Sequence, residues 1–150
     1  MVEIFIDGAS RGNPGEAAVG ILIRQGGKVI KKISKPIGQA TNNVAEYTAL
    51  IYALEAVLPM TVKKIKLHTD SELMYNQLLG RYQVKNVLLK SLFDRSQELG
   101  KKFDDVQIVL IPREKNKDAD QLANQAFKKE QAKGVASAFR AGEESPSSAG

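Results

Sequence analysis

Four carboxylate side chains stand where an acid is unusual in a folded domain. Asp7 and Asp70 each end an apolar run that is typical of a strand. Glu46 falls in the first turns of an apolar helical pattern, and Asp120 lies near the start of another. Hard oxygen ligands of this kind suit Mg²⁺ or Mn²⁺, which share their coordination with substrate phosphates. A metal-binding acid cluster would explain all four positions.

Each acid also has a structural explanation when it is taken alone. Glu46 and Asp120 are favoured near helix N-termini by the helix dipole, whatever the protein does. Asp70 and Ser71 could form only a turn and a helix cap. The chemical interpretation therefore depends on whether the fold brings the four acids together.

Composition excludes most other chemistries. The 150-residue chain of 16.4 kDa is 43% apolar and 26% charged, as expected of one compact domain. It has no cysteine, which excludes thiolate nucleophiles, iron–sulfur clusters and the usual zinc knuckles. Its single histidine, His68, excludes a multi-histidine metal site. The net charge of +5 permits a polyanionic partner without proving one.

Hydropathy predicts a cytoplasmic protein. The apolar stretches are broken every few residues, far short of the ~20 residues that a membrane span needs. No apolar N-terminal stretch follows a basic segment, so secretion is not expected. No long apolar stripe is left over once the core is assigned, which favours a monomer.

Strand and helix patterns alternate along most of the chain. A turn-rich loop at 9–15 follows the first strand, Gly26-Gly27 suits a tight hairpin, and 35–38 is expected to break the sheet. The predicted strands are 2–6, 17–24, 28–34, 63–69 and 106–111. Four helices are predicted: one from caps at 41–43 to Pro59, a short one that starts at Ser71, one over 87–99, and one that follows a cap at Asn116.

The order β-β-β-α-β-α-α-β-α predicts an α/β fold. Its five-stranded mixed sheet would join a three-strand antiparallel meander to two parallel strands, flanked by helices with right-handed crossovers. If the first and fourth strands are parallel neighbours, Asp7 and Asp70 lie side by side and the helix with Glu46 packs over them. The folded domain is expected at 1–130, and 131–150 has the composition of a mostly disordered tail.

Four blocks in order resemble type 1 ribonuclease H: DGASRGNPG (7–15), TNNVAE (41–46), TDS (69–71) and NKDADQLA (116–123). The resemblance covers 1–130. It implies a ribonuclease H-like fold and an endonuclease that cuts the RNA strand of an RNA/DNA hybrid. Two Mg²⁺ ions, with Mn²⁺ as a substitute, would bracket the scissile phosphate and leave 5′-phosphate and 3′-hydroxyl ends. By the same resemblance, the metal ligands would be Asp7, Glu46, Asp70 and Asp120.

Substrate contacts are expected around these blocks. The glycine-rich loop after Asp7 can approach the minor groove, where only the RNA strand displays 2′-hydroxyls. The resemblance places 41–43 against the hybrid, although capping of the helix would explain the same residues. The predicted nucleic-acid contacts are Gly8, Ser10, Gly12, Asn13, Thr41, Asn42, Asn43, Ser71, Lys85, Asn86, Arg113 and Asn116.

Two family features are missing. Many members carry a histidine in the loop before the last helix, whereas the corresponding segment 111–115 is short, basic and without histidine here. We hypothesise that Arg113 substitutes for the histidine electrostatically by binding a phosphate. His68 is expected to be packed or hydrogen-bonded instead.

The long basic protrusion of several members is reduced to Arg81, Tyr82, Lys85, Asn86 and Lys90, which predicts weaker and more salt-sensitive hybrid binding than in those members. Two alternatives remain: cleavage that extends to double-stranded RNA, and an inactive hybrid-binding module.

Overall fold

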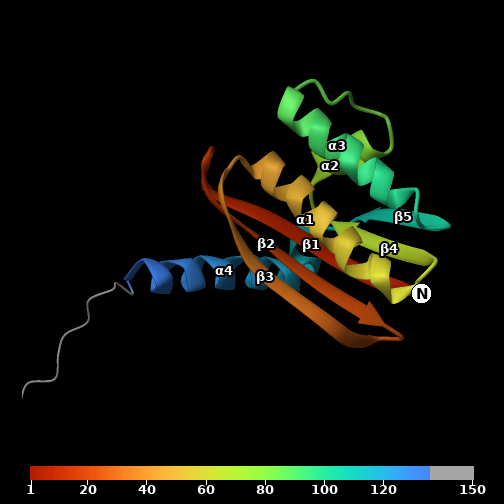
Figure 1. The fold of residues 1–150 in the computed structure, drawn as a ribbon, viewed down its shortest axis with the longest axis horizontal. Coiled ribbons are helices and arrows are strands. Elements are labelled where there is room, and N and C mark those ends of the chain that lie inside the picture. The colour runs from red at the N-terminus through yellow and green to blue at the C-terminus, as the bar shows by residue number, and fades with distance from the viewer. Residues whose placement is uncertain (136–150) are drawn as a thin grey trace, which may run out of the picture.

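The computed structural model describes residues 1–135, with side-chain placements up to Phe127. Its elements, labelled in Figure 1, are β1 (Val2–Gly12), β2 (Gly15–Gln25), β3 (Lys28–Ala40), α1 (Asn42–Val57), η1 (Leu58–Met60), β4 (Lys64–Thr69), α2 (Glu72–Leu78), α3 (Val87–Gly100), β5 (Asp105–Leu110), η2 (Arg113–Lys115) and α4 (Lys117–Val135).

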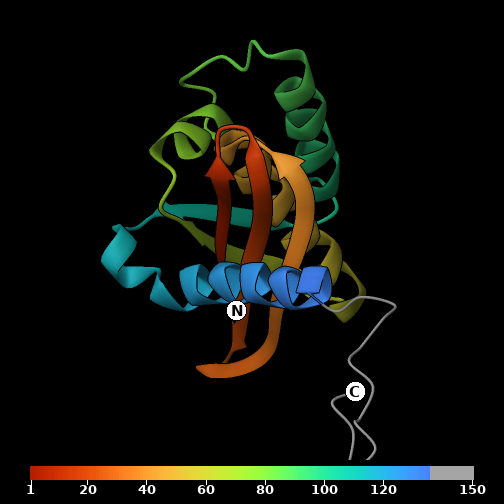
Figure 2. The ribbon, with the colours of Figure 1, turned by 90° about the vertical axis from the view of Figure 1, so that its left-hand side faces the viewer.

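One mixed sheet organises the molecule, with the strand order β3-β2-β1-β4-β5. β1 pairs antiparallel with β2, and β2 with β3, while β4 runs parallel to both β1 and β5. α1 packs on β1 and β2 and also against α3, whereas α4 crosses β1, β2 and β3 on the opposite face of the sheet (Figure 2). The predicted α/β fold, with its meander and two parallel strands, is confirmed.

The main core lies between the sheet and α1. Alternation along β1 buries Val2, Ile4 and Ile6 completely, because successive side chains of a strand point to opposite faces. Tyr47 and Leu54 cover them from α1. This packing fixes the position of α1 along β1. It therefore also fixes the position of the α1 side chains that lie near the end of the strand.

The first three strands are longer than their residue types suggested. The predicted loop at 9–15 is wrong in its length: β1 continues to Gly12 and pairs with β2 down to Gly15, which leaves only the turn at 13–14. The predicted break at 35–38 is also wrong, since β3 continues through it with a register shift opposite Ala17 and Ala18. Pro36 is tolerated because β3 is an edge strand, where a missing N–H costs no ladder bond.

The last helix reaches into the predicted tail. α4 continues to Val135, and 136–150, the rest of the segment predicted to be disordered, lies outside the described residues. None of the helices in the described part of the chain has the length and apolar character needed to cross a membrane.

Candidate metal centre

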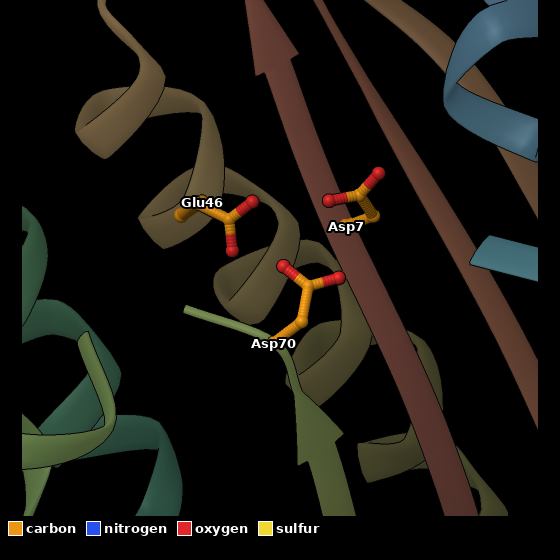
Figure 3. Close-up of side chains that lie close together, drawn as sticks. All are labelled: Asp7, Glu46 and Asp70. Carbon is orange, nitrogen blue, oxygen red and sulfur yellow. The ribbon is translucent and has the colours of Figure 1, made fainter. Parts of the chain in front are cut away.

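Three of the four predicted acids meet where β1 and β4 separate. The last parallel pair is Phe5 with His68, and beyond it β1 carries Asp7 while Asp70 directly follows β4. Glu46 reaches them from α1, so the three carboxylates face one another (Figure 3). One carboxylate oxygen of each acid lies within 4.8 Å of the others. The sequence prediction of a cluster is therefore met by the geometry of these three.

The position of Glu46 depends on a close contact between α1 and β1. Thr41 begins the helix by accepting a hydrogen bond from the Val44 N–H at 3.2 Å. One turn later the Gly8 N–H donates to Glu46 Oε1 at 2.8 Å. A Cβ at position 8 would stand 2.3 Å from the carbonyl carbon and oxygen of Ala45, so only glycine permits this approach.

Asp120 is brought to the centre by a second close contact, on the other face of the sheet. Gly20 of β2 lies opposite Asp7 in the strand pairing. A Cβ at position 20 would stand 2.0 Å from the Ala119 carbonyl oxygen, so α4 rests directly on the β2 backbone. Asp120, the next residue, raises the pKa of Asp7 by hydrogen bonding and by its charge. The fourth acid therefore neighbours Asp7 without being part of the three-acid cluster.

The site holds negative charge at an electrostatic cost. Burial, followed by repulsion from Asp70, raises the pKa of Asp7 to about 7. Burial and the neighbouring Asp7 raise the pKa of Glu46 well above its usual value. Glu46 Oε2 is buried and has no hydrogen-bond partner among the described residues. Buried oxygen acceptors without donors fit a hard divalent cation, so this acidic site could bind a metal.

Asn116 has a role that sequence reasoning missed. Its side chain is 1% exposed, and its Nδ2 donates to the Ile6 carbonyl oxygen at 2.8 Å and to Asp70 Oδ2 at 2.9 Å. α4 does begin directly after it, but Asn116 Oδ1 has no hydrogen-bond partner in the described chain, so the side chain does not cap the helix. Its burial also means that this structure does not present Asn116 to a nucleic acid.

Three predicted contact residues form a network beside the centre. The Ser10 N–H donates to Asn42 Oδ1 at 3.0 Å, and the Asn42 N–H donates to Asn13 Oδ1 at 3.2 Å. Both asparagines are exposed. Because their side-chain oxygens are occupied, their NH₂ groups are the parts available to a ligand. This network ties the β1–β2 turn to the start of α1.

The remaining predicted contacts are spread more widely. Ser71 caps α2 by accepting from the Met74 N–H, and Asn86 caps α3 by accepting from the Leu89 N–H. Lys85 precedes that cap in the exposed loop between α2 and α3 (Figure 1). The other exposed members are Gly12, Asn43 and Arg113, whereas Gly8 is buried under α1. Their proposed contacts with nucleic acid stay predictions.

His68 has the packed position that was expected. Its ring stacks on Phe5 with the centroids 4.1 Å apart, and its Nδ1 lies 3.0 Å from the Ile4 carbonyl oxygen. Its Nε2 lies 3.6 Å from a carboxylate oxygen of Glu3. These contacts hold the imidazole within the β1–β4 pair.

Comparison with known proteins adds independent information. A family model described as reverse transcriptase-like matches residues 5–126. Ribonuclease HI of Halobacterium salinarum is 45% identical over 127 residues, which cover 84% of this chain and 64% of that protein. A bifunctional protein of Mycobacterium tuberculosis is 38% identical over 128 residues, 84% of this chain and 35% of its own length. The chain therefore spans less than two thirds of both relatives.

Among solved structures, LC11-RNase H1 in complex with an RNA/DNA hybrid matches the fold with a TM-score of 0.83 and 39% identity. That match covers 87% of this chain and 99% of the other.

Proposed function

The chain belongs to the ribonuclease H family of reverse transcriptase-like domains, and from this premise we propose that it is a metal-dependent endonuclease that hydrolyses the RNA strand of RNA/DNA hybrids. The products would carry 5′-phosphate and 3′-hydroxyl ends. The observation that carries the proposal is the cluster of Asp7, Glu46 and Asp70, whose carboxylate oxygens lie within 4.8 Å of one another.

The four carboxylates supply what the chemistry requires. Asp7, Glu46 and Asp70, with Asp120 beside them, would hold two Mg²⁺ ions, or Mn²⁺ in their place. Bound cations of this kind supply activation of the attacking water and charge stabilisation at the leaving 3′ oxygen. The chain's own residues orient the carboxylates: the Gly8 N–H donates to Glu46, which fixes this side chain and partly opposes the rise in its pKa that burial and Asp7 cause.

Selection of the RNA strand would come from the network at the start of α1. The NH₂ groups of Asn13 and Asn42 are exposed while their oxygens are engaged internally. A 2′-hydroxyl can accept a hydrogen bond from such a donor, and a DNA strand has none to offer. Because the network also positions α1, which carries Glu46, recognition and metal binding share one structural support.

A second surface for the hybrid would be a basic hollow formed by the loop between α2 and α3 and by the start of α3. Tyr82, Lys85 and Lys90 line a hollow there, and the Tyr82 side chain is half exposed. An exposed aromatic ring in a hollow lined by two lysines, of which Lys90 is ion-paired with Asp94, suits a nucleic-acid backbone and its sugars. Since few phosphates would be neutralised, hybrid binding should be weak and sensitive to salt.

Cleavage of four labelled substrates tests the proposal: RNA/DNA hybrid, double-stranded RNA, single-stranded RNA and double-stranded DNA, each with Mg²⁺ or Mn²⁺. We expect cleavage of the hybrid, its loss in Asp70→Asn, and its retention in Asp104→Asn, which changes an exposed acid directly before β5, at the opposite end of that strand from the acid cluster.

If double-stranded RNA were cleaved comparably, the proposed metal chemistry would stand, but the enzyme would act on double-stranded RNA as well as on hybrids. Hybrid binding without cleavage of any substrate would identify a binding module instead.

A further inference from the structure

We infer that Asn116 is a positioning residue, which fixes the Asp70 carboxylate for divalent-cation binding and ties the start of α4 to β1. The inference rests on the proposed metal site and adds a residue that acts through Asp70. Asn116 is not placed among the cation ligands.

The orientation of the Asn116 amide is unambiguous. Its two polar neighbours, the Ile6 carbonyl oxygen at 2.8 Å and Asp70 Oδ2 at 2.9 Å, can only accept hydrogen bonds when Asp70 is ionised. The NH₂ group must therefore face them, because a rotated amide would set oxygen against oxygen. Both amide hydrogens are thus committed, one to β1 and one to the acid.

Asp70 needs such a restraint more than its neighbours do. It follows the end of β4, so no strand pairing holds it, and it faces the charge of Asp7. Among the described residues, Asn116 is the one hydrogen-bond donor to the Asp70 carboxylate. Glu46 has the equivalent restraint from the Gly8 N–H. Without Asn116, repulsion from Asp7 would turn the Asp70 carboxylate away.

Asn116 links three acid-bearing segments, two through its side chain and one through its backbone carbonyl oxygen. Ile6 immediately precedes Asp7, and the Asp120 N–H donates to the Asn116 carbonyl oxygen at 3.1 Å in the first turn of α4. Asn116 therefore connects β1, the end of β4 and α4 at one buried point. Hydrogen-bond partners of metal ligands hold the ligand in its binding orientation, and their removal lowers metal affinity by about 10–100-fold.

Isothermal titration of the full chain with Mn²⁺, without substrate, measures this effect directly. Asn116→Ala should weaken Mn²⁺ binding by about tenfold or more. Asn116→Ser keeps a hydroxyl donor, so its Mn²⁺ affinity should lie between that of the alanine variant and that of the wild type. The matched control is Asn76→Ala, which removes a buried amide that donates to the Glu72 carbonyl oxygen at 2.8 Å and should leave Mn²⁺ affinity unchanged.

A double variant separates action through Asp70 from general damage. In the Asp70→Asn background, Asn116→Ala should cause little further loss of Mn²⁺ affinity, since the carboxylate it positions is gone. Full additivity, or wild-type affinity in folded Asn116→Ala or Asn116→Ser, would overturn the inference while leaving the metal site intact. Absence of Mn²⁺ and Mg²⁺ binding by the wild type would overturn the metal site itself, so the two failures are distinguishable.

Discussion

Gly20 is the point where α4 touches the backbone of β2, and Gly20→Ala tests whether this contact sets the position of Asp120. The new Cβ would stand 2.0 Å from the Ala119 carbonyl oxygen and 2.5 Å from the Ala123 nitrogen, whereas ordinary contact begins at 3.4 Å. Backbone atoms cannot rotate away as a side chain can. α4 must therefore withdraw from the sheet by roughly 1.4 Å, because packed interiors have no spare volume to absorb the group.

Two measurable effects follow from that displacement. Overpacking of this kind lowers the free energy of unfolding by about 1–3 kcal/mol. Because Asp120 is the residue after Ala119, its carboxylate withdraws with the helix, and a 1 Å misplacement of a catalytic group costs about 100-fold in rate. We expect kcat for hybrid cleavage to fall by about that factor, while α1, on the other face of the sheet, keeps Glu46 in place.

Urea unfolding and steady-state cleavage of a labelled hybrid measure the two effects. The matched control is Gly100→Ala at the end of α3, where a Cβ would meet nothing within 4 Å. That variant should unfold and cleave like the wild type. If Gly20→Ala also kept wild-type kcat and stability, α4 would not be seated by Gly20 and this account of Asp120 would be refuted.

Three further outcomes are expected. The pKa of Asp7 is raised to about 7 from 3.8, so the folded protein keeps a proton that the unfolded chain releases, and without metal its stability should fall as pH rises from about 4 to about 7. With a chelator present to remove metal, Asp7→Asn should therefore raise the melting temperature at about pH 8 and have little effect at about pH 4. The reverse pattern would contradict the raised pKa of Asp7. Arg113→Ala should lower kcat in steady-state assays if the guanidinium binds a phosphate, whereas Lys115→Ala, the neighbouring control on η2, should change it little. Tyr82→Ala should raise KM for the hybrid with kcat unchanged, and an unchanged KM would remove the α2–α3 loop from the binding surface.

Local patterns were sufficient for the order of the elements, and together with the family resemblance they predicted the three-acid cluster. Alternating burial over β1 and helical spacing over α1 reflect neighbours that are close in sequence. The ends of the first three strands were not predictable in this way. Gly12 and Pro36 belong to turn-forming residue types, yet both are held in strands because the partner strand pairs with them. Tertiary pairing here outweighed the local propensity.

The role of Asn116 illustrates a different limit. An asparagine before a helix is favoured as a cap, and its residue type carries no sign of a distant acceptor. The Ile6 carbonyl oxygen that fixes it lies 110 positions earlier in the chain. Only the parallel placement of β1 and β4, with α4 laid across β1, brings this acceptor and Asp70 within reach of one amide.

The two close-contact glycines did leave a signal in the sequence. Gly20 stands alone within the apolar run of β2, without turn-forming neighbours, and an isolated glycine in a strand marks a place where another backbone approaches. Gly8 follows Asp7 directly, where it was assigned to a loop and to substrate contact. In the fold, Gly8 admits α1 with Glu46, and Gly20 admits α4 with Asp120, from opposite faces of the sheet. The acids can come together only because these two positions lack a Cβ, so the glycines belong to the pattern of the proposed metal site as much as the carboxylates do.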